Sequence, residues 1–246
     1  MKKPVIKVNG LRDEKSIRKV SEWDIDILGL DFRRNSPQHL EMISSMAGII
    51  PDYSKERLSK AVQGISKLDE NRSQTTTSNL NQHQLMRAGI FADEMPQTII
   101  TYVYNYSLDF VQLDGYESNI MMDNLKRTLI PDIAPHIRLI KTIKATTNEE
   151  IATYKTFEGA ADLLIICPQD AEGHLKLSLL DAYEGQTPFL IGGNITASDL
   201  NNILVVNNPK FIGIDLRLQD EDEMSNLPLP LIHDFIIRMS SSSCRK

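Results

Sequence analysis

Short hydrophobic runs alternate with longer polar segments along most of this chain. Each run is rich in β-branched or large apolar side chains, which is typical of a parallel strand that is buried on both faces. We predict eight strands on this basis. They are Val5–Val8, Ile25–Leu30, Ala88–Ala92, Phe110–Leu113, Leu139–Ile143, Leu163–Ile166, Phe189–Ile191 and Phe211–Ile214.

The segments between these runs carry apolar residues three and four positions apart, which is the spacing of an amphipathic helix. The predicted helices are Asp13–Val20, Met95–Tyr106, Glu117–Leu129, Asn148–Phe157, Thr196–Val205 and Leu229–Met239. Asn148 and Thr196 are residue types that commonly cap the N-terminus of a helix, so we expect them to act as caps here.

The repeated alternation of strand and helix predicts the fold class. Eight such units favour an α/β fold with a single (β/α)₈ barrel, the TIM barrel, over an open doubly wound sheet. The chain has 246 residues, close to the roughly 250 that are typical of this barrel. We therefore expect one domain over residues 1–246, although length alone would also allow two small domains.

One segment interrupts the alternation between the second and third predicted strands. Residues 67–84 are polar and rich in Thr, Asn and Gln, so they offer little surface to bury. We interpret them as a mobile insertion. Because an excursion after a strand lies on the catalytic face of a barrel, a lid over the barrel mouth is the alternative.

Charge and composition argue against several partners. The chain has 27 Lys and Arg against 33 Asp and Glu, a net charge of -6 and no long basic block, so we expect no binding of nucleic acid. No stretch approaches the ~20 apolar residues of a membrane span. The first apolar run is interrupted by Lys7 and is too short for a signal peptide. We therefore expect a cytoplasmic protein with no membrane contact, in which Cys167 and Cys244 are free thiols.

The histidines give no indication of a metal site. None of them is spaced with another His, Cys or carboxylate on one predicted element as metal ligands are. No nucleotide-binding loop and no Ser-centred elbow occurs either. We predict no metal and no organic cofactor. The histidines are His39, His83, His136, His174 and His233.

Candidate functional residues lie at the C-terminal ends of the predicted strands, where barrels carry their active sites. Arg33, Arg34 or Arg217 could hold a carboxylate or a phosphate, although the adjacent Arg33 and Arg34 could instead be a solvated pair. Asp114 could act as a general base, or it could simply face water. Gly192-Gly193-Asn194 precedes a predicted helix, and its glycines would let a phosphate approach the backbone; a tight turn without a ligand is the alternative.

Seven short motifs follow one another in order along the chain. They are Lys7-Val8-Asn9-Gly10, Asn35-Ser36-Pro37-Gln38, Val111-Gln112-Leu113-Asp114-Gly115-Tyr116-Glu117, Leu139-Ile140-Lys141, Ala161-Asp162-Leu163-Leu164, Gly192-Gly193 and Gly213-Ile214-Asp215. Together they resemble the phosphoribosylanthranilate isomerase family, a group of TIM barrels that act in tryptophan biosynthesis. The resemblance runs from Val5 to about Met239, apart from the polar insertion.

The resemblance implies an isomerase, specifically one that performs the Amadori rearrangement of N-(5-phosphoribosyl)anthranilate. In the family a general acid opens the ribose ring, and a general base then removes the proton from the second sugar carbon. The family base is a cysteine of the first strand, and the acid is an aspartate that ends the sixth. Asn9 and Cys167 stand at these two positions. An amide does not accept a proton at neutral pH, whereas a thiol could donate one. A small buried hydrophobe is the alternative interpretation of Cys167.

Other family positions also differ. Gln38 stands where the family has the arginine that holds the anthranilate carboxylate, and Asp114 replaces a histidine at the barrel mouth. Asp215 matches a family aspartate that lines the sugar site. Arg33 or Arg217 could replace the lost anion-binding groups.

Three functions therefore remain open. The chain is a phosphoribosylanthranilate isomerase in which Asp114 or Cys167 transfers the proton, a barrel that acts on a different phosphosugar, or a non-catalytic relative (a pseudoenzyme) that binds a phosphorylated metabolite or another enzyme. The expected small ligand is a phosphorylated sugar or the anthranilate ribotide. The sequence does not distinguish a monomer from a homodimer.

Overall fold

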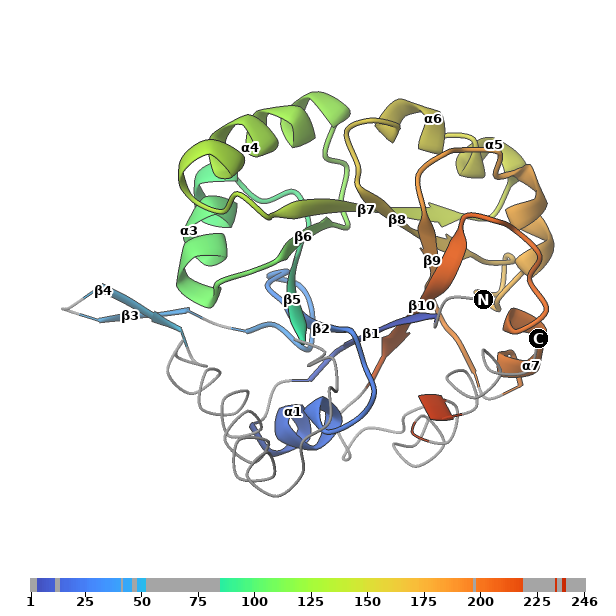
Figure 1. Ribbon diagram of the computed structural model, residues 1–246, viewed down its shortest axis with the longest axis horizontal. Coiled ribbons are helices and arrows are strands. Elements are labelled where there is room, and N and C mark those ends of the chain that lie inside the picture. Colours follow the sequence, from blue (N-terminus) through green and yellow to red (C-terminus); the bar gives the residue numbers. More distant parts are fainter. Residues whose placement is uncertain are drawn as a thin grey trace, which may run out of the picture.

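Eight parallel strands form a closed barrel in the computed structural model of the chain (Figure 1). The structure describes residues 4–11, 14–40, 42–45, 48–51, 85–196 and 198–218, together with His233, Ile236 and Ile237. In their order around the barrel from β1, the strands are β1 (Val5–Asn9), β10 (Phe211–Arg217), β9 (Phe189–Ile191), β8 (Leu163–Pro168), β7 (Arg138–Ala145), β6 (Phe110–Leu113), β5 (Met86–Phe91) and β2 (Ile27–Asp31). The predicted TIM barrel and its eight strands are therefore confirmed.

The barrel closes where the first strand pairs with the last. In this pairing Lys7 is opposite Asp215 and Asn9 is opposite Arg217. The register places residues from both ends of the sequence next to each other at the mouth of the barrel. Because the strands are parallel, their C-terminal ends all meet at this one mouth.

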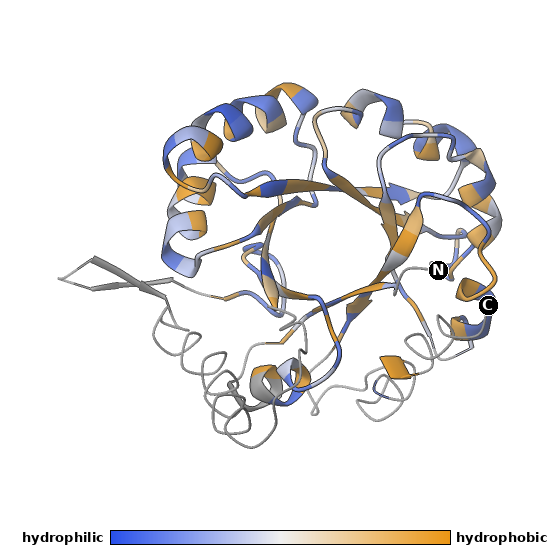
Figure 2. Cartoon of the chain, viewed as in Figure 1, coloured by the Kyte–Doolittle hydropathy of each residue, from blue (hydrophilic) through white to orange (hydrophobic). Residues whose placement is uncertain are grey.

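The barrel strands consist mainly of hydrophobic residues (Figure 2). Their buried side chains belong to two hydrophobic clusters, which explains why the strands appear in the sequence as predominantly apolar runs. A larger cluster packs the strands against the surrounding helices; Ile6, Val8, Ile99 and Leu125 belong to it. A smaller cluster fills the interior of the barrel. It consists of Ile27, Ala88, Phe110, Ile140, Leu163, Ile165, Cys167 and Leu190, with Val5, Met86 and Ile212 packed against it.

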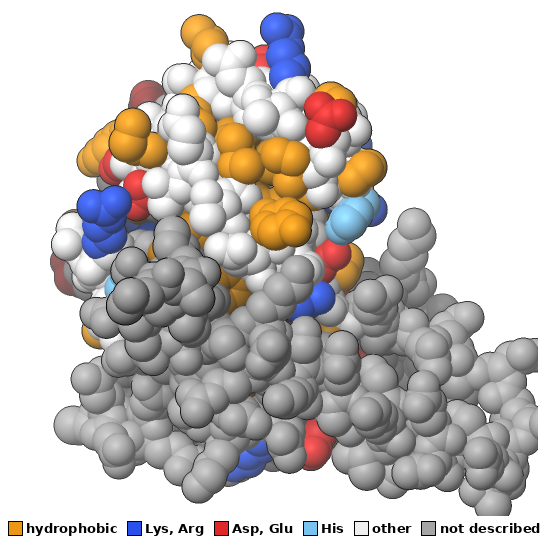
Figure 3. Space-filling view, turned by 90° about the vertical axis from the view of Figure 1, so that its left-hand side faces the viewer, with side chains coloured by type: hydrophobic (Ala, Val, Ile, Leu, Met, Phe, Trp, Pro, Cys, Tyr) orange, Lys and Arg blue, Asp and Glu red, His pale blue; other side chains and the backbone are white. Residues whose placement is uncertain are grey.

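Helices surround the barrel (Figure 1). They are α1 (Glu14–Ser21), α3 (Pro96–Tyr106), α4 (Asn119–Asp132), α5 (Asn148–Ile151), α6 (Tyr154–Phe157), the 3₁₀ helix η1 (Leu177–Ala182) and α7 (Leu200–Ile203). Figure 3 views the side of the molecule that carries α3, where hydrophobic side chains are interspersed with polar ones. Among the described helices, none has the length and apolar character needed to cross a membrane.

The predicted helix Asn148–Phe157 is divided into two short helices, and its predicted cap is wrong. Thr147, not Asn148, is the N-cap of α5, because Thr147 and Glu150 satisfy each other's backbone N–H groups in a capping box. The division follows from Thr153, whose hydroxyl donates to the carbonyl oxygen of Glu150 at 2.7 Å. This bond competes with the regular backbone pattern of the helix.

The predicted cap at Thr196 is wrong as well. α7 begins at Leu200, and Asp199 is its N-cap residue. The amide and the hydroxyl of Thr196 both donate to Oδ2 of Asp199, at 2.8 and 2.5 Å. Thr196 is therefore a donor to Asp199 in the turn before the helix, and the helix is shorter than the apolar spacing indicates.

The connection between β2 and β5 contains an antiparallel hairpin that the sequence pattern does not predict. It consists of β3 (Met42–Ser45) and β4 (Gly48–Pro51), with Met42 paired with Pro51. The predicted mobile insertion at residues 67–84 lies outside the described residues. The predicted helix Leu229–Met239 also lies outside them, except for His233, Ile236 and Ile237, which are helical.

Candidate active site

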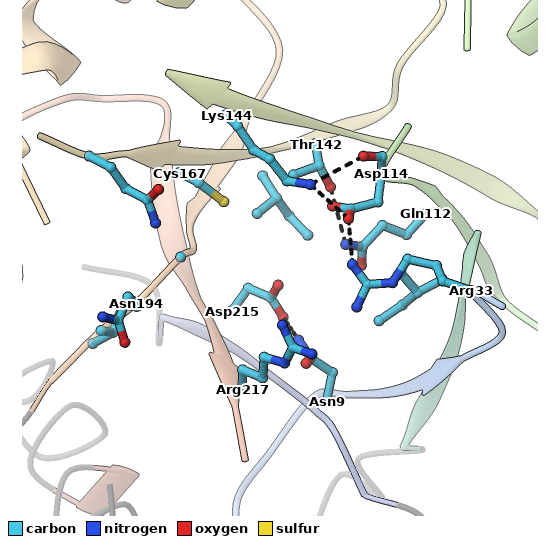
Figure 4. A pocket seen from close by; sticks show the side chains of 15 residues that line it. Asn9, Arg33, Gln112, Asp114, Thr142, Lys144, Cys167, Asn194, Asp215 and Arg217 are labelled. Carbon is cyan, nitrogen blue, oxygen red and sulfur yellow. Dashed lines mark hydrogen bonds and ion pairs between the residues drawn. The ribbon is translucent and has the colours of Figure 1, made fainter. Parts of the chain in front are cut away.

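A cavity of about 380 Å³ opens at the C-terminal mouth of the barrel (Figure 4). It is lined by side chains or backbone from all eight barrel strands or the loops that follow them, and it brings together most of the residues singled out from the sequence. Gln38 and Gly192 do not line this cavity but contact residues that do. The predicted site residues in its wall are Asn9, Arg33, Asp114, Cys167, Gly193, Asn194, Asp215 and Arg217.

Asp215 is anchored by two neighbours from β1. The ammonium group of Lys7 lies 2.6 Å from Oδ1 of Asp215, and the side-chain amide of Asn9 donates to the same oxygen at 2.9 Å. Lys7 is fully buried, and Asp215 is 7% exposed. The two opposite charges compensate each other in the barrel interior, where either charge alone would be strongly destabilising.

Arg33 joins Asp31, the last residue of β2, to Asp114, which follows β6. Its guanidinium makes a bidentate contact with Asp31, at 2.9 and 2.6 Å, and its Nη1 lies 2.5 Å from Oδ2 of Asp114. The hydroxyl of Ser36 donates to Asp31 at 2.6 Å. Burial by itself would raise the pKa of Asp31, but the hydrogen bonds from Arg33 and Ser36 outweigh it and lower the pKa below its ordinary value. The pKa of Arg33 is raised, mainly because of its hydrogen bonds to Asp31.

Asp114 also binds a second cation across the cavity wall. The ammonium group of Lys144, at the end of β7, lies 3.1 Å from Oδ2 of Asp114. Figure 4 shows Asp114 and Lys144 on the side of the cavity opposite Asp215 and Asn9. Arg33, Lys144 and Asp114 therefore form a charged wall in which two cations share one carboxylate oxygen.

Arg217, at the end of β10, is held by Gln38. Nε and Nη2 of Arg217 donate to Oε1 of Gln38 at 3.2 and 2.5 Å. Gln38 is 4% exposed, so the amide is a fixed support for the guanidinium. The arrangement places a positive charge at the mouth next to the position where the sequence lacks the expected arginine.

Cys167 lies in the cavity wall at the end of β8, with 7% of its surface exposed. Burial raises the pKa of its thiol well above the ordinary value, and the negative charges of Asp215 and Asp114 raise it further. The thiol is therefore protonated at neutral pH. Gly192 packs closely against it: a Cβ at Gly192 would lie 3.2 Å from Sγ of Cys167 and 2.6 Å from Cγ2 of Ile165, so a larger residue there would displace its neighbours.

The glycine turn after β9 has two features that favour anion binding and one nearby carboxylate that opposes it. Gly193 has φ +103°, a backbone conformation that favours glycine. A Cβ there would lie 3.1 Å from Nε2 of Gln169, so a side-chain amide faces the turn. Asp199 places a carboxylate on the amide of Thr196 a few residues later. Gly193, Asn194 and Gln169 all line the cavity, whereas Asp199 does not.

A wider hollow continues outward from the cavity and shares Arg33, Asp114, Lys144 and Arg217 with it. A buried ion pair borders this hollow. Lys141 lies 2.9 Å from Oε2 of Glu117, and the exposed fractions of the two side chains are 4% and 1%.

Both partners of that pair also bind the loop after β6. Lys141 donates to the carbonyl oxygen of Gly115, and Glu117 accepts the amides of Asp93 and Gly115. These bonds fix the loop that begins at Asp114.

Several residues of the site were not singled out from the sequence. Lys7, which binds Asp215 without lining the cavity, stands inside an apolar run. Lys144 lies near the end of β7 and Gln169 follows β8, and neither belongs to a recognisable motif. Gln112 donates to the hydroxyl of Thr142 at 3.1 Å, while its buried Oε1 has no hydrogen-bond partner among the described residues. The alternation of inward and outward side chains along a barrel strand is the signal that could have identified Lys7 and Gln112.

One cluster outside the cavity has the composition of a metal site. The ligand atoms of Asp170, Glu172 and His174 lie within 4.8 Å of one another. The cluster is on the surface, and Oδ1 of Asp170 accepts the backbone amides of Glu172 and His174. Hydrogen bonding within this turn explains its geometry.

Comparison with known proteins identifies the family. A family model described as N-(5'phosphoribosyl)anthranilate (PRA) isomerase matches residues 35–217. The chain belongs to this family. It is 25% identical over 243 residues to the N-(5'-phosphoribosyl)anthranilate isomerase of Parabacteroides distasonis, with 93% of this chain and 94% of that protein covered. It is 23% identical over 238 residues to that of Phocaeicola vulgatus, with 94% and 96% covered.

Solved structures agree in fold with this member of the PRA isomerase family. The crystal structure of phosphoribosyl anthranilate isomerase from Thermus thermophilus superposes with a TM-score of 0.64 at 13% sequence identity, and the match covers 97% of this chain and 99% of that chain. At this identity the likeness concerns the barrel alone. The resemblance inferred from the seven motifs is therefore confirmed at the level of family and fold.

Proposed function

We propose that the protein catalyses the isomerisation of N-(5'-phosphoribosyl)anthranilate, a step of tryptophan biosynthesis. The observation that carries the proposal is the cavity of this family barrel, whose wall combines two carboxylates, Asp114 and Asp215, with three cations, Arg33, Lys144 and Arg217. The substrate carries a carboxylate and a phosphate, and its conversion needs proton transfer at the sugar that lies between them. This cavity offers cations that can bind the anionic groups and carboxylates that can transfer protons.

Arg217 is our candidate for holding the anthranilate carboxylate. Gln38 occupies the family position of the carboxylate-binding arginine, and it binds Arg217 directly. A guanidinium pairs with a carboxylate through two parallel hydrogen bonds. This pairing would bind the anthranilate group and also fix the orientation of its ring. In this proposal the positive charge has moved from the loop after β2 to the end of β10. Arg33, whose fork is already paired with Asp31, contributes a further positive charge to the cavity wall.

The turn at Gly192-Gly193-Asn194 is our candidate for the phosphate. Support comes from its position in the wall, from the close approach that Gly193 allows, and from the amide of Gln169 that faces it. α7 has four residues, so its dipole adds little. The carboxylate of Asp199, which accepts the amide of Thr196, does not line the cavity.

Two groups at neighbouring strand ends could protonate the ribose ring oxygen. Cys167 and Lys144 are opposite each other in the register of β7 and β8, and both line the cavity. The thiol keeps its proton at neutral pH, because its pKa is raised by burial, and it gives that proton up reluctantly. Asp114, the base candidate from the sequence, shares one oxygen between two cations and therefore also orients Arg33 and Lys144.

A relative that binds the ligand without converting it is the second candidate function. The amide at Asn9 cannot serve as a base, and the raised pKa of Cys167 makes the thiol a weak acid. These two features favour binding without turnover. A barrel that converts a different phosphosugar would use the same cavity, so the choice among these functions requires an assay.

The test is turnover of N-(5'-phosphoribosyl)anthranilate by the purified chain, followed as the loss of anthranilate fluorescence. A rate that is proportional to enzyme concentration and absent from heat-denatured protein is the expected result. No turnover at high enzyme concentration would contradict the isomerase assignment. A rise in melting temperature with ribose 5-phosphate, without turnover of the ribotide, would then favour a binding protein or another phosphosugar substrate.

A further inference from the structure

We propose that Asp215 is the general base of the reaction, and that Lys7 and Asn9 are positioning residues that aim its carboxylate into the cavity. The inference rests on the proposed isomerase function and assigns the proton-abstracting group that the chain otherwise lacks at the end of β1. Asp215 would remove the proton from the second sugar carbon after the ribose ring has opened.

The hydrogen bonds of Asp215 are divided unequally between its two oxygens. Oδ1 accepts both Lys7 and Asn9, at 2.6 and 2.9 Å. No hydrogen bond from the described residues reaches Oδ2. The side chain lines the cavity while only 7% of the residue is exposed. One oxygen therefore fixes the carboxylate, and the other is available to a substrate.

The position of Asp215 is close to the place that the family base occupies. Asn9 stands at the family position of that base, and its side-chain nitrogen is 2.9 Å from Asp215. β1 and β10 are neighbours at the closure of the barrel, with Lys7 opposite Asp215. Moving the proton-accepting role from β1 to β10 therefore shifts it by one strand. In this arrangement the amide of Asn9 donates a hydrogen bond that orients the new base.

Gly192 packs closely against Asp215 and Cys167. A Cβ at Gly192 would lie 3.5 Å from Cβ of Asp215, 3.2 Å from Sγ of Cys167 and 2.6 Å from Cγ2 of Ile165, so a larger residue there would have to displace its neighbours. Glycine at this position therefore lets Asp215 and Cys167 keep their places in the cavity wall. The wall then contains a proton acceptor and a proton donor, the two kinds of group that an aldose-to-ketose conversion needs.

The other carboxylates of the mouth are placed less well for this step. Asp31 does not line the cavity, and Arg33 and Ser36 occupy both of its oxygens. Asp114 is on the opposite side of the cavity from Asn9 (Figure 4), and it shares an oxygen between Arg33 and Lys144. Only Asp215 combines a place beside Asn9 with a fully buried counter-charge, among the described residues.

In the ring-opened Schiff base, Oδ2 of Asp215 takes the proton from the second sugar carbon. The electrons of that C–H bond form a double bond between the first and second carbons, and the C=N electrons move to the protonated nitrogen. The product is an enolamine. Transfer of a proton to the first carbon and loss of the hydroxyl proton at the second then give the ketose amine.

The experiment compares Asp215→Asn and Asp215→Ala with wild type in the full-length protein. We expect either substitution to lower kcat by about 10²–10⁴-fold with a much smaller change in KM. Formate, a small carboxylate, should partly restore turnover to Asp215→Ala and have no effect on wild type. Substrate that carries deuterium on the second sugar carbon should react more slowly in the rescued variant than substrate that carries ordinary hydrogen there.

Asp162→Asn is the matched control. Asp162 also pairs with a lysine, Lys126 at 2.8 Å, and accepts the amide of Leu139 at 2.7 Å, but at the opposite end of β8 from the cavity. It should change the melting temperature without changing turnover. Asn9→Ala should lower kcat less than Asp215→Asn, because it loosens the base without removing it.

The outcomes separate the base assignment from the proposed function. Wild-type turnover together with full turnover by Asp215→Asn would overturn the base assignment and leave the isomerase intact. A change confined to KM or to the melting temperature would also overturn it. No turnover by wild type would overturn both proposals. A loss of kcat in Asp215→Ala with rescue by formate would support the base assignment.

Discussion

Gln38 and Arg217 are 179 positions apart in the sequence, and the guanidinium of Arg217 donates twice to the side-chain oxygen of Gln38. A residue from the loop after β2 thereby supports a cation at the end of the last strand. The pair forms part of the mouth where a substrate carboxylate is proposed to bind. In the proposed function, Arg217 takes over the role of the arginine that the family has at the position of Gln38.

Replacing Arg217 should therefore weaken substrate binding more than catalysis. We expect Arg217→Lys to raise KM by about tenfold or more, because an ammonium group cannot make the paired hydrogen bonds of a guanidinium. Steady-state kinetics with N-(5'-phosphoribosyl)anthranilate measures this. Arg127→Gln, which removes a charge from the exposed face of α4, is the control and should leave KM unchanged. An unaltered KM in Arg217→Lys would contradict the carboxylate assignment.

The thiol of Cys167 should be unreactive in the folded protein. Burial raises its pKa, and only the thiolate form of a cysteine attacks alkylating reagents. At pH 8 we expect iodoacetamide to modify Cys167 in the folded chain more slowly than in the urea-unfolded chain by more than about tenfold. Mass spectrometry of the peptide that contains Cys167 measures the rate separately from Cys244. Equal rates in the two states would show that the thiol is exposed and ionisable.

The same raised pKa predicts a loss of stability at high pH. The unfolded chain releases the thiol proton near the ordinary value of 9.0, whereas the folded chain retains it. Above that value the unfolded state binds fewer protons than the folded state, so the free energy of unfolding falls as pH rises. Cys167→Ala should flatten this decline. Urea denaturation between pH 8 and pH 10.5 measures it, and parallel curves for wild type and variant would argue against the prediction.

The Asp31–Arg33 pair should stabilise the protein at neutral pH and lose that effect in acid. Because the pKa of Asp31 is lowered in the folded state, its contribution is present above the ordinary value of 3.8 and declines as pH falls through the folded-state pKa. Asp31→Asn should lower the free energy of unfolding by about 3 kcal/mol at pH 7. The difference from wild type should narrow below about pH 4. Urea denaturation at several pH values checks this, and a difference that is independent of pH would contradict it.

The buried Lys141–Glu117 pair should be strongly coupled. Lys141→Met leaves the carboxylate of Glu117 buried without its partner and should lower the free energy of unfolding by about 3–5 kcal/mol. Removing both charges, as in Lys141→Met with Glu117→Gln, should recover part of this loss. A double-mutant cycle from denaturation curves measures the coupling. Strictly additive effects would show that the two side chains act independently.

The barrel could be predicted from sequence because its strands are buried on both faces. Such strands appear as short, predominantly apolar runs, so all eight were found and only their ends moved by a few residues. The N-caps were less predictable: Thr147 and Asn148 are both good capping types, and only the reciprocal bonds of Thr147 with Glu150 decide between them. The hairpin of β3 and β4 follows no strong alternation of apolar and polar residues.

The positions of the site residues could be predicted from the ends of the strands, but the contacts between these residues could not. Asn9, Asp114 and Asp215 were found because they end strands or follow them. Their partners could not be found in the same way. Lys7 resembles an interruption of an apolar run, and its ion pair with Asp215 depends on which strands meet when the barrel closes. Strand closure is a long-range property that local sequence patterns do not encode.

The closure of β1 on β10 has a further consequence for how this protein folds. The proposed base and its lysine anchor are 208 positions apart, so the contact between them closes nearly the whole chain into one loop, at a greater cost in entropy than a local contact. An intermediate that lacks the last strand would contain a lysine charge in its interior with no carboxylate to meet it, and it would have no reaction centre. Enzymatic activity would therefore report completion of the barrel itself, and a half-barrel fragment would remain inactive until its missing half was supplied.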